Sequence, residues 1–477
     1  MERLSALDAE FLHIEDGVGH MHIAGACTFD DPPPSLGELL DLVASKLHRI
    51  PRYRQRVRSV PLDLGRPVWA DDPHFELGYH VRHTALPAPG DDATFRNLMG
   101  RLMSQPLDRA RPLWETWLVE GLHGGRWALV FKVHHCMVDG VAGVGLLAEL
   151  LDLERETSLE EPVPWAPEPE PSGASKVLDA WQGAIEDVTH TVSQVPRLVT
   201  RPQAALREAL DTGRGLVRAA TSLRSAQPRS LGGDIGPHRV WSHSEATLAD
   251  VKRVRLRFGG TVNDVVLAAV SGGFRELLVA RGEDPEQTVV RSLVPVSTRH
   301  EDQRGVTTNR VSMLLYELPV HVADPVERLQ LVTEQVAELK ASHMAEAGDA
   351  VTRLGDLAPP MLMSSVSRLV VRAMHRLPQR SVNTVTTNVP GPQFPLYCLG
   401  RRMTGYWPYV PIAPGVRLGT AILSYDGVLS FGFTGDRATA PDVDVLARST
   451  TGAVAELVRL SGADVEVEVE VEVREVP

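Results

Sequence analysis

The spacing of apolar and polar residues predicts that strands and helices alternate along the chain. Residues 126–135 (RWALVFKVHH) show the alternation of a half-buried strand and form the clearest strand of the first half. Apolar residues recur at helical spacing over 35–48 and over 95–105, so we expect a helix at each place. A longer helix is predicted over 262–280, closed by Gly282.

The second half of the chain carries four further predicted strands. Two of them cover residues 288–296 and 309–318. The other two, over 417–425 and 429–434, flank Asp426-Gly427, a dipeptide typical of a tight hairpin turn. Because strands and helices are interleaved in both halves, the sequence predicts two α/β domains.

Changes in composition predict where the chain divides. Residues 159–173 (LEEPVPWAPEPEPSG) are acidic and hold five prolines, which predicts an extended linker. Residues 193–230 carry seven arginines against only Glu208 and Asp211, a pattern typical of a solvated helix face. The alternating valine and glutamate of 465–476 predict a frayed low-complexity end, with an edge strand as the alternative. The expected units are an N-terminal domain over 1–158, a linker and arginine-rich crossover over 159–239, a C-terminal domain over 240–463 and a tail over 464–477.

Composition and charge narrow the class of protein. The 49 basic and 61 acidic residues give a formal charge of −12, which argues against nucleic-acid binding. Three distant cysteines without a CxxC pair favour a reduced, cytoplasmic setting and no zinc site. The N-terminus has no apolar signal region, and no run of about 18 uncharged apolar residues occurs, so we expect neither a secretion signal nor a membrane span.

Two adjacent histidines in the run HHCMVDG, at the end of the strand 126–135, are the strongest candidates for chemistry. His135 continues the apolar row that begins at Trp127, and His134 faces the other side of the strand. An imidazole is the side chain best suited to take a proton from a hydroxyl at neutral pH. Asp139, followed by Gly140 where the chain can turn sharply, can cap the next helix or pair with an arginine and so aim His135.

Three other interpretations of this run exist. His135 can be a buried core histidine beside a helix-capping aspartate. His134, His135 and Asp139 can hold a metal, although adjacent strand residues face opposite ways and no HExxH motif is present. Cys136 can be a nucleophile. The sequence has no G-x-S-x-G elbow, Walker loop or G-x-G-x-x-G run, so nothing points to a serine hydrolase or a nucleotide triphosphatase.

The run HHCMVDG resembles the HHxxxDG motif of the bacterial wax ester synthase/diacylglycerol acyltransferase family, which is related to chloramphenicol acetyltransferase-like and condensation-domain proteins. Other segments resemble the same family, in family order, over nearly the whole chain: LSALDAEFLHIED (4–16), RPLWETWLVEGL (111–122), TVNDVVLAAVSGGFR (261–275), VPVSTR (294–299), TTNVPGP (386–392) and SYDGVLSFGFTGD (424–436).

This resemblance implies an O-acyltransferase that moves a long-chain fatty acyl group from acyl-CoA to a fatty alcohol or to the free hydroxyl of a diacylglycerol. It implies two chloramphenicol acetyltransferase-like α/β domains with mixed sheets and an active-site tunnel at their interface. By the same resemblance His135 is the general base, and the acceptor hydroxyl attacks the thioester directly. No cofactor and no metal are implied, because acyl-CoA is a co-substrate.

The resemblance also suggests roles for the other residues of HHxxxDG. Asp139 would be structural, with Arg299 or Arg54 as its partner, and the sequence does not choose between the two arginines. His134 would either orient the motif or simply pack.

Two further groups would support the site. Asn263 and Asp264 follow a Gly-Gly-Thr run at the start of a helix, where free backbone N–H groups suit an oxyanion or the CoA end of the site, although an ordinary helix cap explains them equally well. Asn388 opens a rigid loop in which Gly391 stands between two prolines, and we expect this loop to line the site. Trp114 most simply packs in the core.

An enzyme with apolar lipid substrates needs access to a membrane or a lipid droplet. Two segments are candidates for such a peripheral contact. Residues 361–377 place Arg368, Arg372 and Arg376 along one side of a helix beside apolar residues, which fits an interfacial helix or a helix that covers the core. The arginine-rich residues 193–230 are the other candidate. Two alternative functions stay open: an acyltransferase of the same fold that uses a carrier-protein thioester or a secondary-metabolite acceptor, and a non-catalytic lipid-droplet protein.

Overall fold

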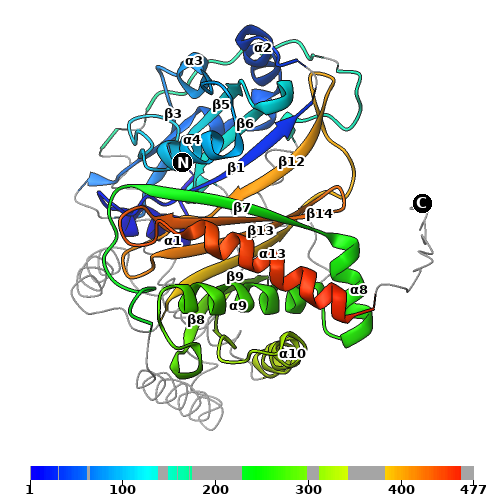
Figure 1. Ribbon diagram of the computed structural model, residues 1–477. Coiled ribbons are helices and arrows are strands. Elements are labelled where there is room, and N and C mark those ends of the chain that lie inside the picture. The colour runs from blue at the N-terminus through cyan, green and yellow to red at the C-terminus, as the bar shows by residue number, and fades with distance from the viewer. Residues whose placement is uncertain are drawn as a thin grey trace.

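The computed structural model describes residues 2–30, 32–61, 65–137, 149–157, 159–170, 172–173, 228–297, 311–341 and 382–462. Within them, two six-stranded mixed sheets lie one above the other in the view of Figure 1. Helices pack on both sheets, as the α/β prediction requires. None of the helices in these ranges is long and apolar enough to cross a membrane.

The first sheet has the strand order β11-β12-β1-β6-β5-β4. Helix α2 (Leu36–Lys46) packs on one face of it, against the apolar row of β6 that includes Trp127 and Val133, and α4 (Asp92–Met103) packs on the other. The strands are β1 (His22–Phe29), β4 (Val81–Ala85), β5 (Trp114–Glu120), β6 (Trp127–His134), β11 (Tyr397–Cys398) and β12 (Arg401–Tyr409). Smaller elements of this half are α1 (Ala6–Ile14), α3 (Leu77–His80) and the hairpin of β2 (Gln55–Arg58) with β3 (Val68–Asp71).

The second sheet has the strand order β7-β14-β13-β10-β8-β9. Its strand β10 runs parallel to both neighbours, and the other pairs are antiparallel. The strands are β7 (Arg239–Thr247), β8 (Val290–Ser297), β9 (Val311–Leu318), β10 (Thr384–Pro390), β13 (Leu418–Tyr425) and β14 (Val428–Asp436). One large apolar core joins this sheet to α8 (Leu248–Phe258), α9 (Val262–Ala280), α10 (Pro325–Ala341) and α13 (Val443–Leu460).

Strand β12 links the two halves, because it comes from the C-terminal part of the chain but lies in the first sheet. It pairs antiparallel with β1, where Ala24 faces Tyr409. The two sheets meet closely beside it: a Cβ added at Gly432 would lie 1.7 Å from the carbonyl oxygen of Pro408, and the indole N–H of Trp241 donates to the same oxygen at 3.2 Å. Only a glycine at position 432 therefore allows the sheets to approach this far.

Several of the predicted elements are confirmed. Helix α9 spans the predicted residues and begins with a capping box between Thr261 and Asp264. Strands β13 and β14 form the predicted hairpin, and Asp426 and Gly427 both have positive φ (44° and 82°), as such a turn needs. Residues 159–170 of the proline-rich linker have no regular secondary structure, and nearly all of them are exposed; the linker runs beside the N-terminal half of the structure (Figure 1).

The strand predicted over 126–135 ends one residue earlier than expected. The strand β6 ends at His134, and His135 begins a 3₁₀ turn, His135–Met137, so it does not continue the apolar row of the strand. The tail 464–477, the segment 361–377 and nearly all of the arginine-rich residues 193–230 lie outside the described residues.

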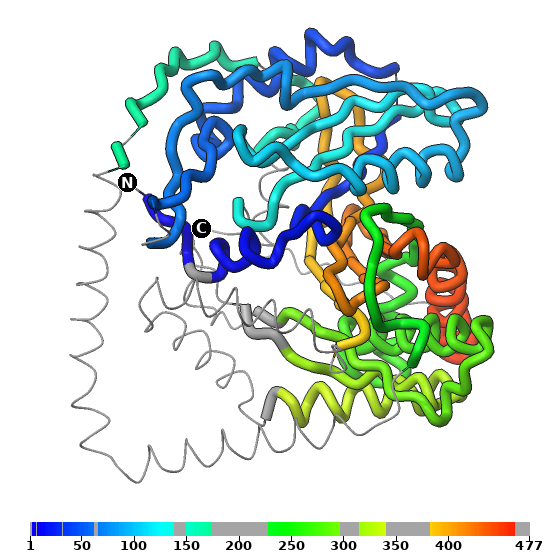
Figure 2. Tube along the Cα trace, turned by 90° about the vertical axis from the view of Figure 1, so that its left-hand side faces the viewer, coloured from blue at the N-terminus to red at the C-terminus, as the bar shows by residue number. Residues whose placement is uncertain are grey.

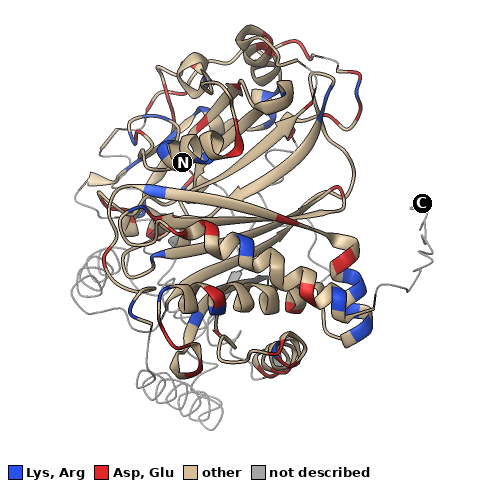
Figure 3. Ribbon diagram, viewed as in Figure 1, with Lys and Arg blue, Asp and Glu red and all other residues tan. Residues whose placement is uncertain are grey.

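Basic and acidic residues are interspersed along the ribbon in Figure 3, in keeping with the overall composition. The main exception in that view is α8, where basic residues gather toward the C-terminal end of the helix. They are Lys252, Arg253, Arg255 and Arg257.

Candidate active site

The two histidines lie at the end of a central strand of the first sheet. Strand β6 is paired on both sides, with β1 and with β5. The backbone N–H of His134 donates to the carbonyl oxygen of Leu113 at 2.9 Å, and that of His135 donates to the carbonyl oxygen of Met21 at 2.8 Å. Main-chain bonds to the residues just before both neighbouring strands therefore fix this end of β6. Figure 2 shows the helix α1 beside it.

The ring of His134 is buried and its two nitrogens have different surroundings. The backbone N–H of Cys136 donates to Nδ1 at 3.1 Å, and Nε2 lies 3.6 Å from Oε2 of Glu15. A backbone N–H can only donate, so Nδ1 must present its lone pair. The proton of the neutral ring is then on Nε2, facing the carboxylate of Glu15.

Glu15 follows α1 and is held by several donors. Its carboxylate accepts bonds from Arg109, with Nε at 3.0 Å and Nη2 at 2.5 Å, and from the backbone N–H of Met21 at 3.2 Å. Burial by itself would raise the pKa of Glu15, but the facing imidazole of His134 and the hydrogen bonds and charge of Arg109 lower it to about 2. The carboxylate is therefore ionised at neutral pH.

His135 has different surroundings from His134. Its ring is partly exposed, whereas that of His134 is buried. It stacks on the ring of Phe11 of α1, with 3.9 Å between ring centroids and 18° between ring planes. Of the two adjacent imidazoles, that of His135 is the more accessible to another molecule.

Cys136, between the histidines and the rest of the motif, is buried among apolar side chains such as Leu12 and Leu113. Burial raises the pKa of its thiol well above the ordinary value. The thiol therefore stays protonated at neutral pH, which argues against its use as a nucleophile.

Not every residue of the HHxxxDG motif, nor every predicted partner of the motif, lies within the described residues. Asp139, Gly140 and Arg299 lie outside the described residues. The alternative partner of Asp139, Arg54, is described, and its guanidinium lies 5.0 Å from the ring centroid of Trp165 in the linker. Trp114 packs in the core as expected: it is buried between Tyr53 and His80, and its indole N–H donates to the carbonyl oxygen of Tyr53 at 2.8 Å.

The second predicted group comes from the second sheet and its helix α9. The side-chain amide of Asn388, on β10, donates to Oδ1 of Asn263 at 3.2 Å, so the structure brings these two predicted residues together. Asp264 is buried, and its Oδ2 accepts the backbone N–H of Thr261 at 2.8 Å, which is the helix cap that the sequence offered as the alternative. Its Oδ1 has no hydrogen-bond partner among the described residues.

Gly391 fixes the loop that follows β10. Its N–H donates to Oγ of Ser424 at 3.2 Å, and a Cβ at this position would lie 2.2 Å from the carbonyl oxygen of Ser424. Any other residue would push the loop away from the β13–β14 hairpin.

Comparisons with known proteins identify the family. The family description "Wax ester synthase/diacylglycerol acyltransferase catalytic domain" matches residues 4–266, and that of the WS/DGAT C-terminal domain matches residues 307–458. The chain belongs to the wax ester synthase/diacylglycerol acyltransferase family. It is 39% identical over 471 residues to a Mycobacterium tuberculosis (strain H37Rv) protein named "Probable diacyglycerol O-acyltransferase tgs1", covering 97% of this chain and 96% of that protein.

Solved structures agree with this assignment. The wax ester synthase/diacylglycerol acyltransferase from Marinobacter aquaeolei VT8 superposes with a TM-score of 0.70 at 26% identity, covering 97% of this chain and all of that one. The first condensation domain of the CDA synthetase superposes with a TM-score of 0.58 at 17% identity, covering 96% of each chain, and shows a shared fold. The predicted family, the two-domain mixed α/β fold and the nature of the protein as an acyltransferase are thereby confirmed.

Sequence reasoning missed several residues of this acyltransferase that lie around the histidines. Glu15, Phe11 and Arg109 are three of these residues. Lys132, two positions before His134 on the same face of β6, is buried and donates to the carbonyl oxygen of Leu102 at the end of α4 at 3.0 Å. Burial lowers the pKa of Lys132 to about 8. The spacing of Lys132 and His134 along a strand was the available signal, because polar residues at alternate positions share one face.

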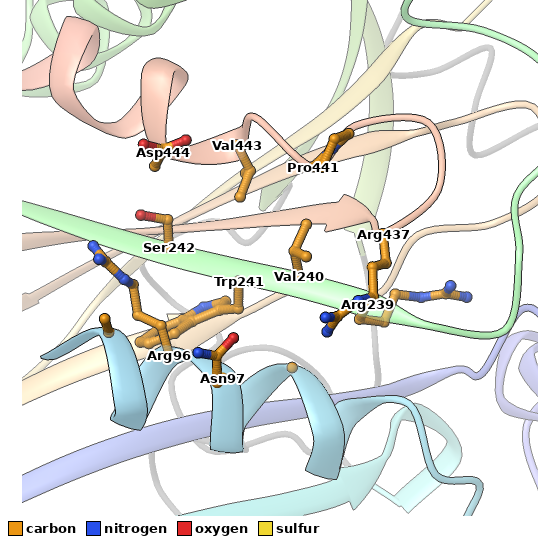
Figure 4. A pocket seen from close by; sticks show the side chains of 12 residues that line it. Arg96, Asn97, Arg239, Val240, Trp241, Ser242, Arg437, Pro441, Val443 and Asp444 are labelled. Atoms are coloured by element: carbon orange, nitrogen blue, oxygen red, sulfur yellow. The ribbon is translucent and has the colours of Figure 1, made fainter. Parts of the chain in front are cut away.

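The described part of the acyltransferase also has a cleft of about 200 Å³ between α4, β7 and the start of α13 (Figure 4). Arg96, Arg437 and Asp444 line it together with the buried Ser242. None of the predicted site residues lines this cleft. Among the described residues, no group of three or more histidine, cysteine or acidic side chains is placed to hold a metal ion.

Proposed function

We propose that this acyltransferase moves a long-chain fatty acyl group from acyl-CoA to the hydroxyl of a diacylglycerol, of a long-chain fatty alcohol, or of both. The observation that carries the proposal is the difference between the two adjacent imidazoles. The lone pair of His134 is used by the backbone N–H of Cys136, whereas the ring of His135 is partly exposed. His135 is therefore the histidine that can serve as the base.

In the proposed reaction, His135 takes the proton of the acceptor hydroxyl as the oxygen attacks the thioester carbonyl. A C–O bond forms, the carbonyl electrons move onto the oxygen, and a tetrahedral intermediate results. When the intermediate collapses, the C–S bond breaks and the protonated His135 returns its proton to the CoA thiolate, so the products are the ester and CoA. A positioned general base contributes typically about 10²–10⁴-fold to the rate, and alignment of the two substrates supplies more.

The transfer proceeds without an acyl-enzyme. The only thiol in the motif is that of Cys136, and its burial and raised pKa oppose nucleophilic attack. The two substrates therefore need to be bound together, and ordinary ping-pong kinetics are not expected.

The remaining predicted residues have supporting roles in this proposal. Asn263 and Asn388, which are bonded to each other, and the loop at Gly391 border the acyl donor or the oxyanion. Asp139, followed by Gly140, holds the turn after the histidines and pairs with Arg299 or Arg54.

Diacylglycerol is the acceptor that the comparisons favour, because the Mycobacterium tuberculosis relative is named for it. The Marinobacter structure is named for both wax ester and diacylglycerol chemistry, so a fatty alcohol is a second acceptor to test. Both acceptors are lipids, and we place the enzyme in the cytoplasm with peripheral contact to the inner membrane face or to lipid droplets. No cofactor is part of the proposal.

The test is product identity when the substrates compete. Purified protein receives palmitoyl-CoA with hexadecanol and dioleoylglycerol together, and the lipids are separated by chromatography. Triacylglycerol, wax ester or both, formed with one CoA released per ester, is the expected result. Free palmitate as the main acyl product would contradict the proposal, as would transfer from a carrier-protein thioester but not from palmitoyl-CoA.

A further inference from the structure

One helix contacts both histidines of the motif. Phe11 lies in α1 and Glu15 directly follows it, and residues four apart share a side of a helix. The ring of Phe11 stacks on His135, and the carboxylate of Glu15 faces Nε2 of His134. The first helix of the chain therefore packs on the residue that we propose as the base and on its neighbour.

The carboxylate of Glu15 is connected to the backbone of the turn by two routes. On the first route, the backbone N–H of Met21 donates to Oε1 of Glu15 at 3.2 Å, and the carbonyl oxygen of Met21 accepts the N–H of His135 at 2.8 Å. On the second route, Oε2 faces Nε2 of His134, whose Nδ1 accepts the N–H of Cys136 at 3.1 Å. Both routes end on consecutive backbone N–H groups of the turn that presents His135.

We propose that Glu15 is a positioning residue for acyl transfer. Its carboxylate keeps His134 in the form with the proton on Nε2, and the ring of His134 in turn holds the Cys136 N–H and the direction of His135. This inference rests on the proposed function only in taking His135 as the base. Glu15 itself need not touch either substrate.

The charged groups around Glu15 come from several parts of the chain. Arg109, after α4, donates to the carboxylate and also to the carbonyl oxygen of Leu12, so it ties the end of α1 to the site. His20, before β1, and Lys132, on β6, face the same region, and burial lowers the pKa of each. If Glu15 served only to anchor α1, its contact with Arg109 would be sufficient. The hydrogen bond from Met21 and the contact with His134 link Glu15 to the turn as well.

A matched control pair exists in the same sheet. His83 of β4 and Glu120 of β5 form an exposed hydrogen-bonded pair with 2.9 Å between Nε2 and Oε1. The variant E120Q therefore makes the same chemical change as E15Q, at an exposed glutamate–histidine pair away from the turn.

The kinetic experiment compares E15A, E15Q and E120Q with the wild type, using palmitoyl-CoA and the acceptor found active. We expect E15A to lower kcat by about 10–100-fold with the KM for palmitoyl-CoA within about 2-fold, because a misplaced base loses rate rather than ground-state binding. E15Q should recover at least part of the loss, because its amide oxygen can still accept from the backbone N–H of Met21 and can still face Nε2 of His134. E120Q should match the wild type. A folded E15A with wild-type kcat, or a loss that appears in KM alone, would overturn the proposal.

A second readout does not depend on acyl transfer. Ring ¹⁵N labelling of histidine, with the His134 signals assigned from an H134Q variant, reports which nitrogen carries the proton. We expect the Nε2–H form in the wild type and in E15Q, and a higher fraction of Nδ1–H in E15A. A wild-type His134 with its proton on Nδ1 would refute the positioning role. If the wild type made no ester while His134 showed the expected form, the proposed function would fail and the arrangement around Glu15 would stand.

Discussion

The ion pair at Glu15 makes a specific prediction for the dependence of stability on pH. The pKa of Glu15 falls from its ordinary value of 4.5 to about 2 in the folded protein. At 1.36 kcal/mol per pKa unit this corresponds to about 3 kcal/mol, and an allowance for screening by solvent reduces the contribution to about 2 kcal/mol. The folded-state pKa lies below the unfolded one, so this stabilisation is complete above about pH 4.5 and is lost as the pH falls toward 2.

The assay is urea unfolding of the wild type and of E15Q between pH 7 and pH 3.5, followed by tryptophan fluorescence. We expect E15Q to be about 2 kcal/mol less stable at pH 7. The gap between the two proteins should narrow by about 1 kcal/mol at pH 3.5, because the unfolded wild type then holds more protons than the folded one. The control E120Q should stay within about 0.5 kcal/mol of the wild type at every pH. A gap that is constant or that widens in acid would refute the assignment of Glu15 as an ionised, stabilising group.

Three further predictions follow from buried contacts. Cys136→Ala should keep kcat within about 2-fold of the wild type. The native thiol should resist alkylation by iodoacetamide at pH 7.5, because burial keeps the thiol protonated. Loss of activity in proportion to alkylation would count against direct transfer. Gly432→Ala should lower the free energy of unfolding by about 3 kcal/mol or more, because its Cβ would overlap the carbonyl group of Pro408; a lower Tm would show this. The control is Gly452→Ala in α13, which has open space around it and should leave stability unchanged or raise it. Trp114→Phe should lower the free energy of unfolding in urea by about 1–3 kcal/mol, because the hydrogen bond to Tyr53 and part of the packing are lost. An unchanged midpoint would show that neither the hydrogen bond nor the packing contributes to stability.

Local sequence signals predicted the elements that depend on neighbouring residues. Helix α9 has a capping pair at its start and apolar residues at helical spacing, so its bounds follow from the sequence. The β13–β14 hairpin follows from Asp426-Gly427, whose residues adopt the positive φ that the turn requires. The position of the two histidines at the end of a strand follows from the alternation in residues 126–135.

Contacts between distant residues were not predictable in the same way. The direction of His135 depends on the turn that begins at this residue and on Phe11, which lies far away in the sequence, and strand alternation describes neither of them. The membership of β12 in the first sheet depends on pairing with β1, which leaves no local pattern. The bond between Asn263 and Asn388 joins residues 125 positions apart. Motif resemblance suggested that both asparagines matter, but only the structure brings them together.

Glu15 illustrates the same limit at the candidate site. It lies inside the segment LSALDAEFLHIED that resembles the family, but a glutamate after a short helix has many ordinary roles. Its contacts with His134, Arg109 and Met21 come from three other parts of the chain. The role of such a residue follows from burial and geometry rather than from residue type.

The central claim is that His135 is the base for direct acyl transfer, and the turnover of His135→Ala tests it most directly. The rate of ester formation from palmitoyl-CoA is measured for this variant, for the wild type and for His83→Ala, an exposed histidine of the same sheet. The account predicts a loss of at least about 10²-fold in kcat for a folded His135→Ala and an unchanged rate for His83→Ala. Turnover by a folded His135→Ala within a few-fold of the wild type would contradict it.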